Sequence, residues 1–135
     1  TIYHPLLNNM YTHDQYNTLI EKTISTIKLL SSLKGGEYAG DKDRLANFKR
    51  NAANLDLLPE QVWGVYAAKH WDAINQYIKD LGNGKSRERI ESITGRADDL
   101  IVYLILFKAL YEDRTINATK NESCNAGAEI KISYA

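Results

Sequence analysis

The chain has 135 residues, and 17 Lys and Arg balance 17 Asp and Glu, so its formal net charge is zero. This length is typical of one domain that buries a core without metal or disulfide support, and a balanced charge disfavours duplex nucleic acid and anionic membranes as partners. The single cysteine, Cys124, excludes an internal disulfide framework and favours a reducing compartment, so we expect a cytoplasmic location. The longest apolar run, near 100–107, is much shorter than the ~20 residues that cross a bilayer, so we expect no membrane span.

The first part of the chain predicts an irregular arm followed by a long helix. Residues 1–11 contain Pro5 and show no helical period, whereas Thr12 with Gln15 resembles a capping box. We expect the helix to end before Gly35 and Gly36, which are typical of helix termination. One face of this helix is marked by Tyr16, Leu19, Ile20, Thr23, Ile27 and Leu30.

Two more helices are expected in the middle of the chain. Asp41 or Asp43 can cap a short helix, whose apolar positions are Leu45, Phe48, Ala52 and Leu55. Pro59 suits the first turn of a third helix, which we expect to stop at 82–84, where the sequence is Gly-Asn-Gly.

A fourth helix is predicted from Ser86, a good cap, to Asp113, and the link before it is then very short. Its first half is amphipathic and its second half, 100–110, is apolar on almost every side, so other helices must surround it. The polar residues 114–135 are expected to form a tail, in which the alternation around Ile130 and Ile132 permits a short strand. The sequence thus predicts an all-α, roughly four-helix up-and-down bundle at 12–113, between an arm at 1–11 and the tail.

The expected hairpin of the third and fourth helices brings a cationic pair opposite acids. If Leu81 faces Ser86, then Lys69 and His70 lie level with Ala97 and Asp98. A buried carboxylate needs a partner, so this arrangement predicts either a buried ion-pair network or the polar floor of a ligand pocket. At the same level, Arg96 and Asp72 are expected to pair.

Acidic spacing in the fourth helix permits a cation site. Glu88-x-x-Glu91 matches one of the acidic pairs of magnesium-dependent all-α nucleotide pyrophosphatases, and Glu91 shares a predicted helix face with Asp98. Mg²⁺ held by Glu91 and Asp98 is therefore the candidate metal site. The alternative is a pair of solvated surface acids. Lys85, Arg87 and Arg89 at the helix start are candidates for phosphate binding or for a solvated basic turn.

Short motifs occur in a fixed order between about Leu33 and Asp113. They are Gly36-Glu-Tyr38-Ala-Gly-Asp41, Leu45-Ala-Asn47-Phe48, Pro59-Glu-Gln-Val-Trp63, Lys69-His70 and Arg96-Ala-Asp98-Asp99-Leu100. In this order the chain resembles the first type of nucleotide-modification-associated domain, found in small helical proteins of tailed bacteriophages and prophages. The resemblance implies an all-α fold and a place in nucleotide or DNA-base metabolism. It also implies functional roles for Glu37, Tyr38, Asn47, Phe48, Lys69, His70, Arg96, Asp98 and Asp99. Ala39 departs from the family pattern, which has glycine there.

These observations together favour a phage-encoded protein that binds a nucleotide or its phosphates in a pocket of the bundle. The expected ligand-binding residues are Lys69 and Arg96 for phosphate, with Glu37, Tyr38, Asn47 and Phe48 around the base or sugar. Asp98, Asp99 and His70 are the candidate catalytic residues for Mg²⁺-assisted hydrolysis of a nucleotide phosphoanhydride.

The alternative function is a non-enzymatic helical homo-oligomer that acts as an adaptor, inhibitor or nucleotide sponge. Trp71 lies opposite the apolar centre of its helix, and an exposed tryptophan favours such a contact. Whether the protein is an enzyme stays open at this level.

Overall fold

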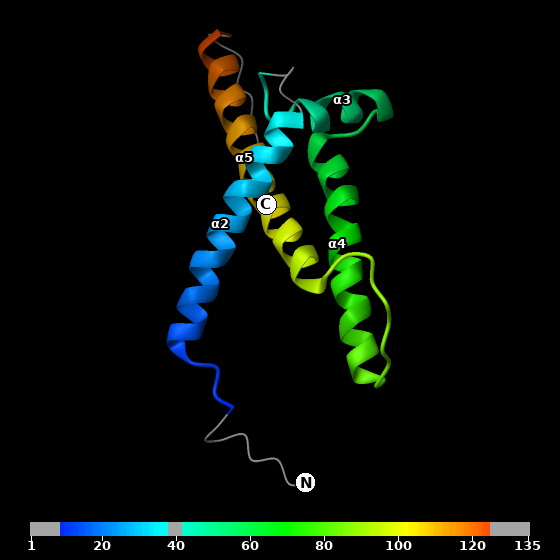
Figure 1. Ribbon diagram of the computed structural model, residues 1–135. Helices are drawn as coiled ribbons and strands as arrows, with labels where there is room; N and C mark the ends of the chain where they lie inside the picture. The colour runs from blue at the N-terminus through cyan, green and yellow to red at the C-terminus, as the bar shows by residue number, and fades with distance from the viewer. Residues whose placement is uncertain (1–8, 38–41, 125–135) are drawn as a thin grey trace.

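The computed structural model describes residues 9–37 and 42–124, and all regular secondary structure in these ranges is α-helical. Four helices follow one another: α2 (His13–Glu37), α3 (Ala46–Leu55), α4 (Pro59–Gly82) and α5 (Ile93–Cys124). The long helices α2 and α5 run in one general direction and α4 runs in the other, with the short α3 across one end (Figure 1). The predicted all-α, four-helix class is therefore confirmed. The predicted strand near Ile130 lies outside the described residues.

The capping box expected at the start of α2 is present. The Gln15 backbone N–H donates to Thr12 Oγ1 at 3.1 Å, and the Thr12 N–H donates to Gln15 Oε1 at 2.8 Å. Each side chain thus satisfies a backbone donor that the first helical turn leaves without an intrahelical partner. The predicted end of this helix was wrong, because α2 continues through Gly35 and Gly36 to Glu37.

The end of α4 agrees with the prediction from Gly-Asn-Gly. Gly84 has a positive φ of 64°, and its N–H donates to the Leu81 carbonyl at 3.2 Å. The Lys85 N–H then donates to the Asp80 carbonyl at 2.8 Å. This pattern is the Schellman motif, in which a left-handed residue lets the chain turn back and satisfy the last carbonyl groups of the helix.

The predicted start of the last helix at Ser86 was wrong. Residues 83–92 form a non-helical link that doubles back beside α4 (Figure 1), and Ser92 is the cap of α5. Ser92 Oγ accepts the Gly95 N–H at 3.0 Å, and the Ser92 carbonyl accepts the Arg96 N–H at 3.0 Å. The hairpin therefore has a ten-residue link instead of a tight turn. Glu91 lies in the link, so it does not share a helix face with Asp98.

The far end of α5 also differs from the prediction. The helix continues beyond Asp113 to Cys124, so residues 114–124, assigned above to a polar tail, are helical. Arg114 forms a bidentate ion pair with Glu60 of α4, in which Nε donates to Oε2 at 2.7 Å and Nη2 donates to Oε1 at 2.6 Å. Extending a helix that is already packed costs far less than nucleating a new one, which explains how a polar sequence continues it.

The core lies where α3, the first half of α4 and the middle of α5 meet. Its buried members are Leu45, Phe48, Ala52, Val62 and Leu110, and Trp63, Tyr66, Tyr103, Leu106 and Ala109 pack around them. The Trp63 indole N–H donates to the Tyr103 carbonyl at 2.6 Å, and the Trp63 ring lies 5.0 Å from the Phe107 ring. Ring contacts and one polar bond thus fix the register of α4 against α5.

The α2 helix is attached to this body through α5 alone among the described helices. Within the described ranges, none of the helices combines the length and the low polarity that crossing a lipid bilayer requires.

We predict that Leu110→Ala lowers the free energy of unfolding by about 2–5 kcal/mol, because it leaves a cavity in the core where Leu110 is 3% exposed. Leu81→Ala is the matched control, since Leu81 is 61% exposed and leaves no cavity. Urea unfolding of both variants measures the difference. Equal losses of stability would contradict this location of the core.

We also predict opposite outcomes for two glycine substitutions. At Gly64 nothing lies within 4 Å of a new Cβ, so Gly64→Ala should stabilise α4 by about 0.5–1 kcal/mol. At Gly95 a Cβ would lie 2.9 Å from Ser92 Oγ, so Gly95→Ala should displace the cap and cancel that gain. Thermal unfolding monitored by circular dichroism measures both. Equal stabilisation by both substitutions would show that Ser92 does not cap α5.

Candidate functional site

His70 is a buried polar residue on the face of α4 that packs against α5. It is 4% exposed, and its ring lies 5.3 Å from the Tyr103 ring. Arg96 Nη1 of α5 lies 3.3 Å from His70 Nδ1. Since a guanidinium group can only donate, this contact makes Nδ1 the acceptor and leaves the imidazole proton on Nε2.

The acid opposite His70 is Asp99. Its Oδ2 lies 3.7 Å from His70 Nδ1, which is too long for a hydrogen bond. Asp98 lies about 200° around the helix from Arg96, on a different side of α5, by the 100° per residue of an α-helix. Lys69 is exposed. The structure therefore brings together His70, Asp99 and Arg96 of the predicted set, but neither Lys69 nor Asp98.

Arg96 joins this cluster to the link. Its Nε lies 3.3 Å from Glu91 Oε2, so the predicted pairing of Arg96 with Asp72 was wrong. Asp72 is exposed on α4. Because Arg96 contacts both His70 and Glu91, it connects the buried interior between the helices with the surface of the link.

Asp80 is the most strongly bound carboxylate near the link. It is 3% exposed and accepts from Arg87 Nε at 2.8 Å, Arg89 Nη2 at 2.9 Å and Gln76 Nε2 at 3.0 Å. The hydrogen bond from Arg87, with further bonds and charges around it, lowers the Asp80 pKa to about 2. The same contact raises the Arg87 pKa, so both groups stay charged over the physiological range.

A pocket of about 320 Å³ lies between the link, α4 and the first turn of α5. We call it the arginine pocket, because Arg87, Arg89 and Arg96 all line it. The remaining lining residues are Ala73, Gln76, Glu88, Ile90, Glu91 and Ile93. Asp80 is not in the lining. The carboxylate that holds Arg87 and Arg89 is thus outside the pocket, and Arg89 also stacks on Tyr77, 5.0 Å from the ring centre.

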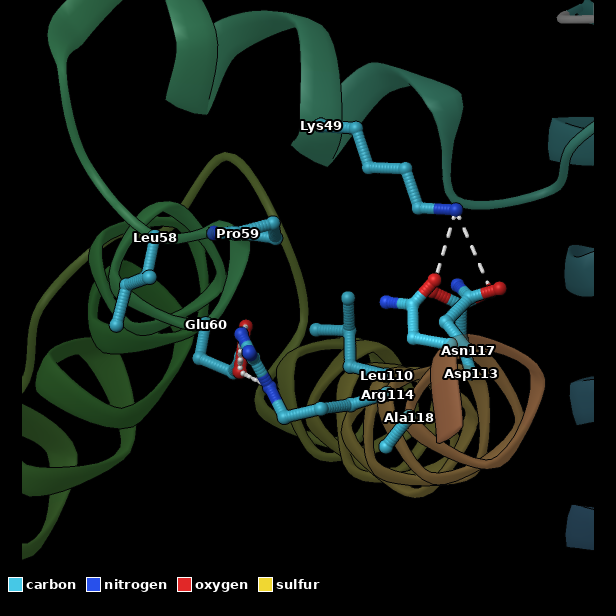
Figure 2. A pocket seen from close by; sticks show the side chains of 10 residues that line it. Lys49, Leu58, Pro59, Glu60, Leu110, Asp113, Arg114, Asn117 and Ala118 are labelled. Atoms are coloured by element: carbon cyan, nitrogen blue, oxygen red, sulfur yellow. Dashed lines mark hydrogen bonds and ion pairs between the residues drawn. The ribbon is translucent and has the colours of Figure 1, made fainter. Parts of the chain in front are cut away.

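A second pocket of about 350 Å³ lies between α3, α4 and the C-terminal part of α5 (Figure 2). Figure 2 shows Glu60 and Arg114 facing each other on one side and Lys49 directed at Asp113 on the other. Lys49 Nζ lies 3.2 Å from Asp113 Oδ2, and the same lysine pairs with Asp43. Both cations of this pocket are bound to carboxylates of the same lining, Glu60 and Asp113. In the arginine pocket this holds for Arg96, which pairs with Glu91, whereas Arg87 and Arg89 are held by Asp80 outside the lining.

The remaining predicted ligand-binding residues lie away from the arginine pocket. Phe48 is 5% exposed in the core, where it packs against Tyr66. Asn47 accepts a hydrogen bond from Asn51, which also donates to the Tyr66 hydroxyl at 2.9 Å. Glu37 is the last residue of α2, and its side chain lies outside the described part, as does Tyr38. Neither Asn47 nor Phe48 lines the arginine pocket.

The sequence reasoning missed the role of Asp80. The signal was present, because an acid stood three residues before Asn83 at an expected helix end, followed by two arginines within nine positions. The sequence predicts only a phosphate site or a solvated turn for the basic residues at 85–89. Their partner could not be found while Ser86 was expected to begin a helix, since that helix would carry the arginines away from α4.

No family model, curated protein or solved structure matches the chain. The resemblance to a nucleotide-modification-associated domain therefore rests on the short motifs alone and stays a prediction. Within residues 9–37 and 42–124, no group of three or more His, Cys, Asp or Glu side chains is arranged to hold a metal ion.

We predict that Asp80 makes stability depend on pH at low pH. Its pKa is lowered from the usual 3.8 to about 2, so its stabilising contribution is complete above pH 3.8 and is lost as the pH falls toward 2. Asp80→Asn should therefore be less stable than the wild type at pH 6, and the difference should shrink between pH 4 and pH 2.

Urea unfolding across this pH range measures the effect. Asp72→Asn is the matched control, because Asp72 is an exposed carboxylate on the same helix and should follow the wild-type curve. A difference between Asp80→Asn and the wild type that is constant at every pH would contradict the ionic role of Asp80.

Proposed function

We propose that the protein binds a small phosphorylated ligand of the nucleotide class in the arginine pocket. The observation that carries the proposal is the convergence of Arg87, Arg89 and Arg96 on one pocket that also has apolar walls. Guanidinium groups bind phosphate oxygens through two parallel N–H donors, which a single ammonium group cannot do. Ala73, Ile90 and Ile93 supply apolar surface suited to a base.

The bonds that the arginines already make leave donors available for a ligand. Arg87 uses Nε and Nη2 on Asp80, and its side chain is still 53% exposed. Each guanidinium has five N–H donors, so binding Asp80 orients the group without exhausting it. A fixed orientation lowers the conformational entropy that the ligand must remove on binding.

Glu88 and Glu91 also line the pocket, and they bear on the predicted Mg²⁺. Two carboxylates alone make a poor magnesium site, but Mg²⁺ commonly binds one or two carboxylates together with substrate phosphates and water. We therefore propose that Mg²⁺ enters with the nucleotide and contacts Glu91. This places the cation at Glu91 without the predicted help of Asp98, which is on another side of α5.

We predict that nucleoside di- and triphosphates raise the melting temperature of the wild-type protein. At 100 times Kd the stabilisation should be about 2.7 kcal/mol. Arg96→Gln should abolish this shift because it removes one of the three guanidinium groups that line the pocket. Differential scanning fluorimetry with a nucleotide panel, with and without Mg²⁺, measures the effect, and inorganic pyrophosphate tests whether the phosphates alone are sufficient.

Arg44→Gln is the matched control, since Arg44 is an exposed arginine outside the pocket and should keep the full shift. Glu91→Gln should keep the shift without Mg²⁺ and lose the additional shift that Mg²⁺ provides. If no nucleotide stabilises the wild type at millimolar concentration, the proposal is wrong.

The same pocket admits the catalytic form of the proposal, which is Mg²⁺-dependent hydrolysis of a phosphoanhydride. Release of pyrophosphate or phosphate from a bound triphosphate would favour it, and a thermal shift without turnover would favour a binding protein. Asp98→Asn tests the catalytic role predicted for Asp98. Because Asp98 does not line the pocket, this variant should keep nucleotide binding whatever its effect on turnover.

A further inference from the structure

Among the described residues, only the C-terminal part of the apolar face of α2 is packed against another helix. This part, including Ile27 and Leu30, is half-buried where α2 packs on α5. The N-terminal part of the same face is exposed and stands clear of the other helices (Figure 1). Its members, here called the α2 stripe, are Tyr16, Leu19, Ile20 and Ile24, which are 40–54% exposed.

The N-terminal part of α2 continues a helix that is packed on α5 farther along, so it does not have to nucleate by itself. Its apolar side chains are nevertheless exposed within the described residues. Most helical stability in proteins comes from packing an amphipathic face. The α2 stripe is such a face, continuous with the part that packs on α5.

A second exposed stripe runs along α5. Leu104, Phe107 and Tyr111 are spaced by three and four residues, so they share one side of the helix, and they are 43–50% exposed. We call them the α5 stripe. Phe107 also packs on Trp63, which fixes one edge of this stripe on the body of the molecule. Leu104 and Tyr111 are each 50% exposed.

We propose that the α2 stripe of one copy packs on the α5 stripe of a second copy, in a twofold symmetric dimer. The two stripes have similar lengths, about 12 Å from Tyr16 to Ile24 and about 10 Å from Leu104 to Tyr111, at 1.5 Å per residue. One chain carries both surfaces, so a single twofold axis covers both pairs at once and leaves neither exposed. A different partner would have to supply two separate surfaces to achieve the same.

The exposed area of the two stripes is close to the area that a dimer interface buries. At about 200 Å² for a fully exposed residue of these types, the exposures of the seven side chains leave roughly 650 Å² of mainly apolar surface per copy. A standard stable interface buries about 800 Å² per partner. The two stripes with their flanking polar residues therefore match what a dimer requires.

Sedimentation equilibrium of the full chain tests the proposal. The wild type should have about twice the chain mass of 15.3 kDa at ~100 μM, a concentration at which even a micromolar dimer is formed. Leu19→Lys and Leu104→Glu should each sediment as a monomer. An equimolar mixture of the two variants should dimerise again, because one α2–α5 contact is then wild type and the other joins lysine to glutamate.

Ile78→Lys is the matched control, since Ile78 is similarly exposed on α4 but belongs to neither stripe, and it should remain dimeric. Circular dichroism checks that each variant is folded. A second test needs no variant: in the wild type, hydrogen exchange of residues 16–24 should slow as the protein concentration rises. A monomeric wild type, a dimeric Leu19→Lys or a mixture that stays monomeric would each overturn the α2–α5 pairing. These last two results would identify another surface, such as α2 against α2, as the contact.

Discussion

The burial of the Asp80 carboxylate, near the C-terminal end of α4, constrains the path of the link that follows. A carboxylate that is removed from water needs charged or polar partners, and here Gln76 supplies one from α4 while Arg87 and Arg89 supply two from the chain that follows. To reach Asp80, that chain has to double back beside α4 (Figure 1), so it cannot begin a helix at once. The late start of α5 and the presence of a pocket between the link and the helices both follow from this pairing.

The register of α4 against α5 is close to the predicted one, although the link between them has ten residues instead of a tight turn. Because the link doubles back, its ten residues do not displace α5 along α4, and His70 still meets the segment around Arg96 and Asp99. Two other contacts fix the same register independently of the link. They are the hydrogen bond from Trp63 to the Tyr103 carbonyl and the ion pair between Glu60 and Arg114.

The two proposals concern separate parts of the molecule. The arginine pocket is built on α4, the link and the start of α5, whereas the α2 stripe lies on the part of α2 that stands away from them (Figure 1). Phosphate recognition needs charged donors that keep a fixed orientation, and association of copies needs apolar area. The chain places these two chemistries on different surfaces, so a ligand and a second copy would not compete for the same side chains.

The sequence alone determined the helical class, the capping box of Thr12 and Gln15 and the end of α4 at residues 82–84. These depend on local spacing and on short-range hydrogen bonds, which a linear pattern records. Only the tertiary structure decided where α5 begins, that it continues to Cys124, and that Asp80 gathers Arg87 and Arg89. In each case tertiary contacts outweighed the local helix propensity of the sequence. Satisfying a buried charge, or extending a helix that is already packed, changes the free energy of folding by more than the helix propensities of a few residues.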